Sequence, residues 1–266
     1  MDEQEDIDHT TETHENAARS ALRAMMDDPS KWAIFLDIDG TLLDLALSPE
    51  AVAVPAGLAD VLNRLSARLG GALALVTGRS LGFVDQLFQP FSFPVAGLHG
   101  ADIRAADGSV SLAGITPEFE GLKEALAEEM LAMPGVLVED KGAAVAAHYR
   151  LAPDYRDVVE ERMRHYAEMA GSGWALQLGK MVFEIRPARS SKGDAVQFFL
   201  QQPPFAGRLP MTIGDDLTDE SMFAVANARG GYSIRVGQRS EPTSALSQAR
   251  TPDFVRAMLK EMADRP

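Results

Sequence analysis

Residues 32–44 read WAIFLDIDGTLLD, a short apolar run that ends in two aspartates, a glycine and a threonine. A run of this length, with bulky residues and a glycine just behind it, predicts a strand. Its near-continuous apolarity suits a parallel strand that is covered on both faces. Ligands of parallel sheets bind beyond the carboxyl ends of the strands, which is where Asp37 and Asp39 fall. The stretch therefore predicts an α/β fold with a site at this strand end.

The two aspartates also indicate a chemistry. Their i, i+2 spacing turns both carboxylates to one side of an extended chain, and two neighbouring carboxylates raise the pKa of one of them unless a cation lies between. An oxygen-only cluster suits Mg²⁺, Gly40 allows a sharp turn close to a ligand, and Thr41 offers a hydroxyl and an N–H to an anion. These parts predict a nucleophilic carboxylate, an acid–base partner and a phosphate cradle, although Asp and Gly also begin ordinary loops.

Composition bounds the kind of protein. The chain has 266 residues, 46% hydrophobic and 24% charged, which is typical of a soluble globular protein of one or two domains. Its net charge of −14 argues against a nucleic-acid-binding surface, and its lack of cysteine excludes disulfides, thiolate metal sites and a cysteine nucleophile. Its acidic start does not resemble a signal peptide, and no apolar run has membrane-spanning length. We expect a cytoplasmic protein whose residues 1–28 form an acidic, partly disordered tail, with helix propensity over residues 17–26.

The next segments extend the sheet. Helical periodicity over residues 55–69, followed by an apolar strand over 72–76, predicts a right-handed crossover between parallel strands. That second strand leads into Thr77, which either binds a phosphoryl oxygen or caps the helix of residues 80–88; the sequence favours neither. A third strand from Val95 leads into His99, which either touches a substrate or packs as a structural residue.

Residues 107–189 have a different pattern, in which half-exposed strands alternate with amphipathic helices over 117–133 and 153–169. This pattern predicts an inserted α/β cap domain, an antiparallel sheet with helices on one face and the other face open. The core domain then comprises residues 29–106 and 190–266. Lys180 and Glu184, four apart in an apparent strand, should face the same side. They either bind sugar hydroxyls or form an ordinary solvated edge.

Two motifs follow the insert. Ser190 or Ser191 can cap a helix whose first turn contains Lys192, where a positive charge opposes the helix dipole. That placement is easier to explain if Lys192 holds an anion. A further apolar strand over residues 209–213 then ends in the carboxylates of Asp215, Asp216 and Asp219.

Taken in order, the motifs Asp37-Ile-Asp39-Gly-Thr41, Thr77-Gly-Arg79, Lys192-Gly193 and Gly214-Asp215-Asp216-Leu-Thr-Asp219 resemble the haloacid dehalogenase (HAD) superfamily of phosphatases. The resemblance implies a Rossmann-like parallel-sheet core, and the position of the insert is similar to that of the larger caps of this superfamily. Gly97-Leu-His-Gly-Ala, Lys141 with His148-Tyr-Arg150, and Gly179-Lys180 with Glu184-Ile-Arg-Pro187 resemble the trehalose-6-phosphate phosphatase family. Asp102 departs from that family's pattern, which usually has Glu there.

The resemblance implies a role for each matched residue. Asp37 would be the nucleophile and Asp39 the general acid and base, while Thr77 and Lys192 neutralise the phosphoryl group. Mg²⁺ would be held by Asp37, the backbone carbonyl of Asp39 and Asp215, with Asp216 beside it or as an alternate ligand. The implied substrate-binding set is Gly40, Thr41, Gly78, Arg79, His99, Lys141, His148, Arg150, Lys180, Glu184, Arg186 and Asp219, the last of which orients Lys192 or a metal-bound water.

The implied reaction is magnesium-dependent hydrolysis of trehalose 6-phosphate to trehalose and phosphate through an aspartyl-phosphate. Other HAD sugar-phosphate phosphatases, such as one acting on sucrose phosphate, and a phosphomutase remain alternatives. A sugar-phosphate sensor that does not hydrolyse is a third, although binding alone does not require both Asp37 and Asp39. The expected partner is a phosphorylated disaccharide, with no nucleic acid or membrane, a functional link to a trehalose-phosphate synthase, and a monomeric state.

Overall fold

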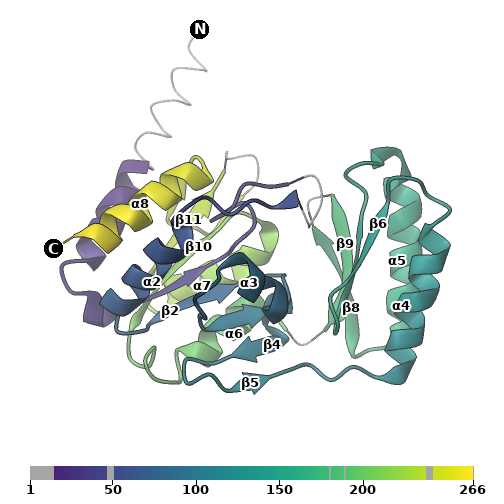
Figure 1. The fold of residues 1–266 in the computed structure, drawn as a ribbon, viewed down its shortest axis with the longest axis horizontal. Coiled ribbons are helices and arrows are strands. Elements are labelled where there is room, and N and C mark those ends of the chain that lie inside the picture. The colour runs from purple at the N-terminus through teal and green to yellow at the C-terminus, as the bar shows by residue number, and fades with distance from the viewer. Residues whose placement is uncertain (1–14, 47–50, 180, 189, 238–241, 266) are drawn as a thin grey trace, which may run out of the picture.

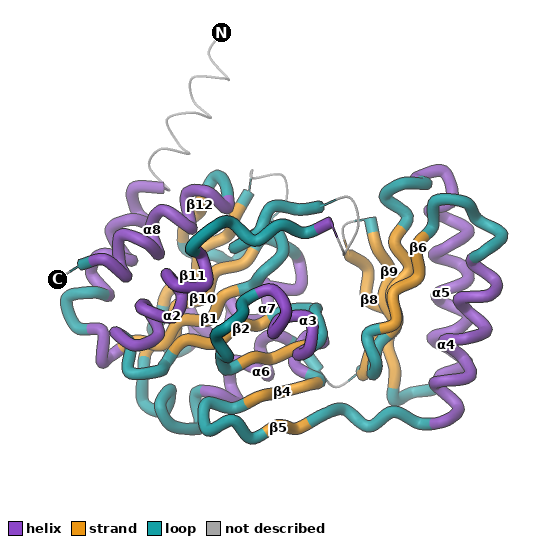
Figure 2. Tube along the Cα trace, viewed as in Figure 1, coloured by secondary structure: helices purple, strands orange, loops and turns teal. Residues whose placement is uncertain are grey.

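The computed structural model describes residues 15–46, 51–179, 181–188, 190–237 and 242–265. The chain forms two units, each built on its own β-sheet (Figures 1 and 2). Among these described residues, no helix combines the length and the apolarity needed to span a membrane.

The larger unit contains an eight-stranded sheet in the order β12-β11-β10-β1-β2-β3-β4-β5. All neighbouring strands from β12 to β3 are parallel, and β4 and β5 extend one edge in antiparallel fashion. β1 (Trp32–Leu36), the strand expected from the opening stretch, lies between β10 and β2 and is buried from Ala33 onward. The predicted parallel core is therefore confirmed. The other strands are β2 (Leu73–Val76), β3 (Val95–Gly97), β4 (Asp102–Arg104), β5 (Val110–Ser111), β10 (Leu209–Gly214), β11 (Tyr232–Val236) and β12 (Ser247–Ala249).

Helices surround this sheet and share one apolar core with its strands. α2 packs against α8, and α6 packs against α7. Because every strand from β1 to β3 and from β10 to β12 runs the same way, the loops that follow them gather at one edge. The helices are α2 (Leu58–Arg68), α3 (Leu81–Leu87), α6 (Lys192–Phe199), α7 (Glu220–Ala228) and α8 (Pro252–Asp264).

A further helix over residues 15–25 packs on the same core. Ala18, Leu22 and Met25 follow helical spacing and are buried, and Arg23 pairs with Glu261 of α8 at 2.8 Å. The helix expected over residues 17–26 is present, but it belongs to the core unit and not to a separate tail of residues 1–28. The narrow apolar stripe is what attaches it. The disorder expected for the start of the tail concerns residues 1–14, which lie outside the described part of the chain.

The smaller unit is a four-stranded antiparallel sheet in the order β6-β7-β9-β8. Two helices, α4 (Pro117–Met130) and α5 (Arg156–Ala170), cover its outer face, and the other face looks toward the larger unit (Figure 1). Phe119, Val159 and Phe183 belong to its own buried cluster. This is the architecture expected of the insert, and we call this unit the cap. Its strands are β6 (Leu137–Asp140), β7 (Val145–His148), β8 (Trp174–Gly179) and β9 (Val182–Pro187).

One expected boundary differs in the structure. The sequence pattern assigned residues 107–111 to the insert, yet β5 pairs with β4 in the larger sheet, with Ile103 opposite Ser111. Gly108, with a φ of +84°, allows the tight turn that folds β5 back on its preceding strand. A local hairpin of this kind joins the sheet that already contains its first strand, so the first regular element of the cap is α4.

Candidate active site

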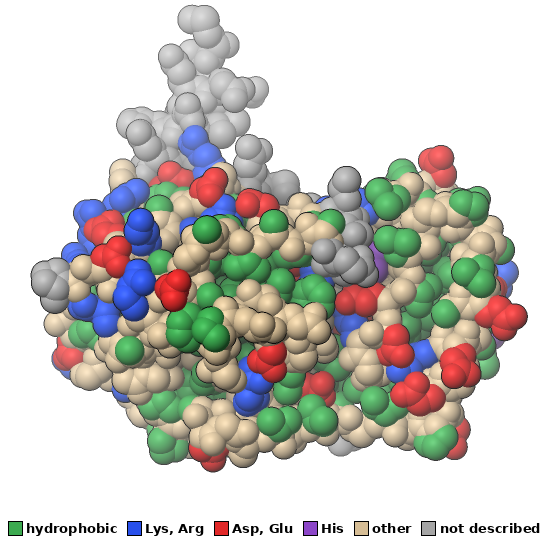
Figure 3. Space-filling view, viewed as in Figure 1, with side chains coloured by type: hydrophobic (Ala, Val, Ile, Leu, Met, Phe, Trp, Pro, Cys, Tyr) green, Lys and Arg blue, Asp and Glu red, His purple; other side chains and the backbone are tan. Residues whose placement is uncertain are grey.

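A cleft lies between the strand ends of the larger unit and the open face of the cap. Figure 3 shows acidic, basic and histidine side chains meeting at this junction. Most of the residues selected from the sequence line it: Asp37, Asp39, Thr77, Gly78, Arg79, His99, Lys141, His148, Arg150, Glu184, Lys192, Asp215 and Asp216. Residues separated by more than 170 positions in the chain therefore meet at one place, as the parallel topology requires.

Lys192 is the centre of the floor of the cleft. Its side chain is only 3% exposed, and Nζ donates hydrogen bonds to Asp37 Oδ1 and to Asp219 Oδ1, both at 2.6 Å. Burial alone would lower the pKa of Lys192, but the two carboxylates outweigh burial and raise it, so the ammonium stays charged. Ser191 caps the helix by accepting a hydrogen bond from the backbone N–H of Asp194, as one of the two expected serines.

Asp219 is fully buried and accepts three hydrogen bonds. Besides the bond from Lys192, its Oδ2 accepts from the backbone N–H groups of Asp215 at 2.8 Å and Asp216 at 2.9 Å. Gly214 makes this approach possible, because a Cβ there would lie 2.3 Å from the Asp219 carboxyl carbon. Asp219 therefore anchors Lys192 and the loop after β10, and it lies beneath the cleft surface.

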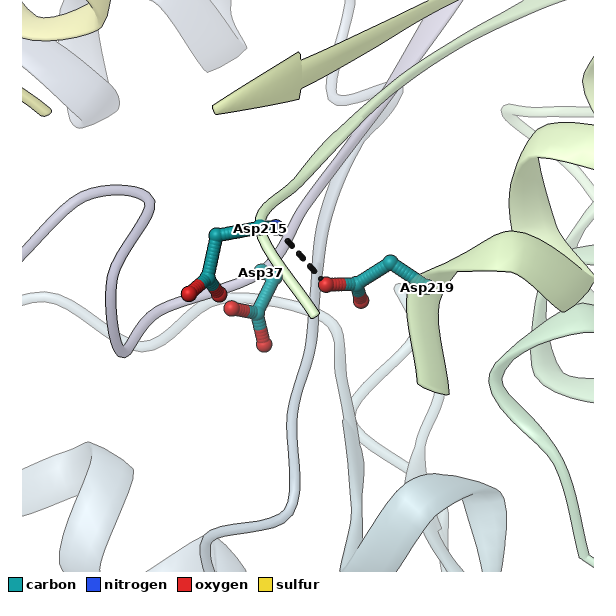
Figure 4. A group of neighbouring side chains, drawn as sticks. All are labelled: Asp37, Asp215 and Asp219. Atoms are coloured by element: carbon teal, nitrogen blue, oxygen red, sulfur yellow. Dashed lines mark hydrogen bonds between the residues drawn. The ribbon is translucent and has the colours of Figure 1, made fainter. Parts of the chain in front are cut away.

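Asp37, Asp215 and Asp219 form an acidic cluster whose carboxylate oxygens lie within 4.8 Å of one another (Figure 4). Burial raises the pKa of Asp37 to about 7, and burial together with the charge of Asp37 raises that of Asp215 to about 9. The sequence attributed the expected shift to repulsion between Asp37 and Asp39, whereas desolvation is the larger cause. Gly40, with a φ of +81°, keeps the loop close, since a Cβ there would lie 2.1 Å from Asp215 Oδ2.

The cluster fits a hard divalent cation. Asp219 already accepts three hydrogen bonds, so the oxygens most open to an ion belong to Asp37 and Asp215, and all donors are oxygens. The cluster has three carboxyls, Asp37, Asp215 and Asp219, against the single ammonium of Lys192, so a bound cation would balance the remaining charge. Asp216 lines the same cleft and accepts from the Leu217 N–H at 2.7 Å.

Asp39 is engaged by Arg79. The guanidinium donates Nε and a terminal nitrogen to the two carboxylate oxygens at 2.8 and 2.7 Å, and it lies over the Phe83 ring at 4.6 Å. Thr77 Oγ1 accepts from the Arg79 N–H at 3.2 Å, while Ser80 is the residue that caps α3. The helix-cap alternative for Thr77 is therefore wrong, and Thr77 stands in the cleft beside Asp37.

The cap reaches the core through Lys141 and Glu184. Lys141 Nζ donates to Glu184 Oε2 at 2.7 Å and to the backbone carbonyl of Gly78 at 3.2 Å. Glu184 Oε1 lies 3.7 Å from Nε2 of His99, a core residue with a φ of +57°. Burial alone would raise the pKa of Glu184, but Lys141 and His99 outweigh burial and hold it well below its usual range. This buried network joins the two walls of the cleft.

Glu139 is a cleft residue that the sequence analysis did not select. Its Oε2 lies 2.9 Å from His148 Nε2, and it faces Lys141 and Arg79. Burial raises its pKa, but the bond to His148 and the charge of Lys141 outweigh burial, so the pKa is lowered. A signal was available, because Glu139 and Lys141 are two positions apart at the end of β6 and an extended chain turns both to one face.

Several selected residues lie elsewhere. The Thr41 side chain is fully buried, its N–H donates to the Ile38 carbonyl, and its hydroxyl has no partner among the described residues. Arg186 holds the chain between cap and core through the Ser190 carbonyl and hydroxyl and through Gln177 Oε1 at 3.0 Å. Asp102 accepts from the Ala113 N–H at 2.8 Å, which fixes the loop between β5 and the cap.

The expectation that Lys180 and Glu184 share one face of a strand stays a prediction. Glu184 lies in β9, which begins at Val182, and β8 ends at Gly179. Met181, just before β9, has a φ of +65°. A methionine rarely adopts this conformation, so the sequence does not predict it. Lys180 itself lies outside the described residues.

The chain is similar to known proteins along most of its length. A family model described as trehalose-phosphatase matches residues 35–253. The chain is 55% identical over 242 residues to a Sinorhizobium fredii protein named probable trehalose-phosphate phosphatase, and the match covers 91% of each. It is 40% identical over 212 residues to the trehalose-6-phosphate phosphatase of Escherichia coli, covering 78% of each.

Solved structures support the fold. The C-terminal domain of C. albicans trehalose-6-phosphate phosphatase matches with a TM-score of 0.80 at 22% identity, covering 92% of this chain and 96% of that one. A haloacid dehalogenase-like hydrolase from Bacteroides thetaiotaomicron matches with a TM-score of 0.59 at 17% identity, covering 87% of this chain and 98% of that one. The expected HAD-type fold is confirmed.

Proposed function

The chain belongs to the trehalose-phosphatase family of enzymes, and from that premise we propose that it hydrolyses trehalose 6-phosphate to trehalose and phosphate, with Mg²⁺, through an aspartyl-phosphate. One observation carries the proposal. A buried lysine, Lys192, holds Asp37 at 2.6 Å beside Asp215 on the floor of a cleft that a polar cap faces. A carboxylate fixed between an ammonium and a cation site is suited to attack a phosphate ester.

In the first step, an Asp37 oxygen attacks phosphorus and the bond from phosphorus to the sugar oxygen breaks. Asp39 gives its proton to that oxygen, and trehalose leaves. In the second step, Asp39 takes a proton from water, the water oxygen attacks phosphorus, and the bond to Asp37 breaks. Lys192 and Thr77 hold the phosphoryl oxygens during both steps. Asp39 releases Arg79, which pairs with it at 2.7 Å, before it takes up the proton.

Mg²⁺ fits the acidic cluster, and the residues that would hold it are Asp37, Asp215 and the backbone carbonyl of Asp39, with Asp216 beside them. When bound, the ion would neutralise carboxylate and phosphate charge that otherwise repel each other. The number of carboxyls supports this assignment, because Asp37, Asp215 and Asp219 outnumber the one ammonium among them, that of Lys192.

The cap wall would bind the sugar. Lys141, Glu184, Glu139 and His148 of the cap, with His99 of the core beside them, provide closely spaced donors and acceptors, which is what the hydroxyls of a disaccharide require. Arg150 lines the same wall. The cytoplasmic location, the monomeric state and the functional link to a trehalose-phosphate synthase remain predictions.

Free phosphate released from a panel of phosphorylated disaccharides and monosaccharides, with Mg²⁺ present, tests the proposal. We expect trehalose 6-phosphate to have the highest kcat/KM. A higher value for sucrose phosphate would assign a different substrate. Transfer of the phosphoryl group to a sugar would indicate a mutase, and binding without release would indicate a sensor.

A further inference from the structure

Lys141 has a demanding position. It lies directly after β6, its side chain is 9% exposed, and its ammonium must reach both Glu184 on β9 and the Gly78 carbonyl of the core. A lysine side chain has four rotatable bonds, so its ammonium takes one position only if the backbone that carries it is fixed. What fixes that backbone therefore controls the sugar-facing wall.

The turn that carries Lys141 is closed by few bonds of its own. The Lys141 N–H donates to the Ala144 carbonyl at 3.0 Å, and the Gly142 N–H donates to Asp140 Oδ1 at 2.8 Å. Gly142 has a φ of +83°. Without further anchors, a turn of this kind at the edge strand of a small sheet shifts easily.

Lys123 supplies those anchors from α4. Its Nζ donates to both oxygens of Asp140, at 2.7 and 2.9 Å, and to the Gly142 carbonyl at 2.9 Å. One ammonium thus holds the residue before Lys141 and the residue after it. Displacement of the turn would break all of these bonds together.

Lys123 is itself held in place. Its side chain is 4% exposed, Glu120 lies 3.1 Å from Nζ, and the Phe119 ring lies 5.9 Å away. Burial alone would lower its pKa, but bonds to Asp140 and Glu120 outweigh burial and raise it. The three donors of the ammonium already face Asp140, Gly142 and Glu120, so this lysine is built as an anchor and not as a ligand-binding group.

We infer that Lys123 is a positioning residue that sets substrate preference. By holding both neighbours of Lys141, it places the Lys141 ammonium where a phosphorylated disaccharide meets the cap, while a small phosphate ester does not need this contact. The inference rests on the proposed function of the cleft.

Lys123→Met tests this inference, because methionine keeps most of the apolar stem and removes the ammonium. We expect KM for trehalose 6-phosphate to rise about tenfold, while kcat/KM for p-nitrophenyl phosphate changes less than about twofold. In Lys123→Arg, KM for trehalose 6-phosphate should stay close to the wild-type value, since a guanidinium can also pair with Asp140. Lys260→Met, an exposed change on α8, is the matched control and should leave KM and kcat/KM unchanged for both substrates.

A double-mutant cycle makes the test specific. If Lys123 acts through Lys141, adding Lys123→Met to Lys141→Met should cause no further loss on trehalose 6-phosphate. A full additional loss, an equal loss on both substrates, or no change in KM would each overturn the inference. If Lys123→Met does not fold, Asp140→Ala removes both oxygens that accept from Lys123, at a side chain that is 58% exposed, and it should give the same selective loss.

The two levels of proposal fail differently. A wild-type enzyme that hydrolyses p-nitrophenyl phosphate but not trehalose 6-phosphate would refute the proposed function and this inference with it. A wild-type enzyme that prefers trehalose 6-phosphate, with a Lys123→Met variant that loses both activities equally, would refute only the inference.

Discussion

The two walls of the cleft contain the same kinds of side chain in opposite electrostatic states. On the core wall, Asp37, which is buried, and Asp215, which is partly buried, have raised pKa values of about 7 and about 9. On the cap wall, the pKa values of Glu139 and Glu184 are lowered, because His148 and Lys141 compensate them. The carboxylates of the core wall therefore outnumber its two cations, Lys192 and Arg79, while the cap wall is balanced by its own residues.

This difference indicates a division of labour. A wall with an excess of carboxylates is suited to a cation, and a bound cation would then favour a phosphoryl group. A wall that is already balanced has little to gain from ions, but it presents fixed donors and acceptors to neutral hydroxyls. We expect changes on the core wall to affect every phosphate ester and changes on the cap wall to affect the disaccharide selectively.

Asp37→Asn should give the largest effect. Without a nucleophilic carboxylate, kcat for both trehalose 6-phosphate and p-nitrophenyl phosphate should fall by about four orders of magnitude, as measured by phosphate release. Asp60→Asn, an exposed change on α2, serves as the control and should retain full activity. Substantial turnover of either ester by Asp37→Asn would reject the proposed role of the core wall.

Removal of the metal should have the second largest effect. A chelator should abolish turnover of both esters, and Mg²⁺ should restore it. Mg²⁺ should also raise the unfolding temperature of the wild type and of Lys141→Met, but not that of Asp215→Asn, because only a protein that binds the ion is stabilised by it. An unfolding temperature that rises equally in all three proteins would locate the ion elsewhere.

Lys141→Met should distinguish the role of the cap wall from that of the core wall. We expect kcat/KM for trehalose 6-phosphate to fall about 100-fold, while that for p-nitrophenyl phosphate changes by less than about threefold. Comparable losses on both esters would show that the cap wall does not select the sugar.

The smallest expected effects concern stability without metal. A carboxyl with a raised pKa in the folded state weakens folding increasingly as pH rises from its unfolded pKa near 4 toward about 9. Asp215→Asn should therefore raise the free energy of unfolding at pH 7 by about 1 kcal/mol or more. Glu184 has a lowered pKa and stabilises the fold above its unfolded pKa, so Glu184→Gln should lower the same quantity at pH 7. Chemical denaturation in the presence of a chelator measures the free energy of unfolding of both variants. Changes of the same sign would contradict the proposed difference between the two walls.

Much of the core wall could be predicted from the sequence, for a simple physical reason. Asp37, Thr77 and Asp215 each follow a short apolar strand, and parallel strands bring their carboxyl ends to one edge. The positions of the strands were therefore enough to predict that these residues, which are far apart in the chain, meet at one site. The partner of each side chain was not predictable in this way, since the choice of Arg79 by Asp39 depends on distances across the fold.

The cap wall was harder to predict because its residues depend on hairpin turns. Met181, which lies between β8 and β9, has a positive φ, and a methionine at that position does not predict such a conformation. Arg186 follows Glu184 by two positions, yet it binds the Ser190 backbone between cap and core. Short strands also escaped notice, since the three residues of β4 and of β12 carry too little pattern to be recognised.

The account depends most on a covalent bond between Asp37 and phosphorus, and rapid acid quenching during turnover of trehalose 6-phosphate labelled with radioactive phosphate tests it directly. Mass spectrometry of the digested protein should find the phosphoryl group on the peptide containing Asp37 in the wild type, and no such label in Asp37→Asn. Label on another residue, or steady phosphate release by a wild-type enzyme that never becomes labelled, would contradict the account.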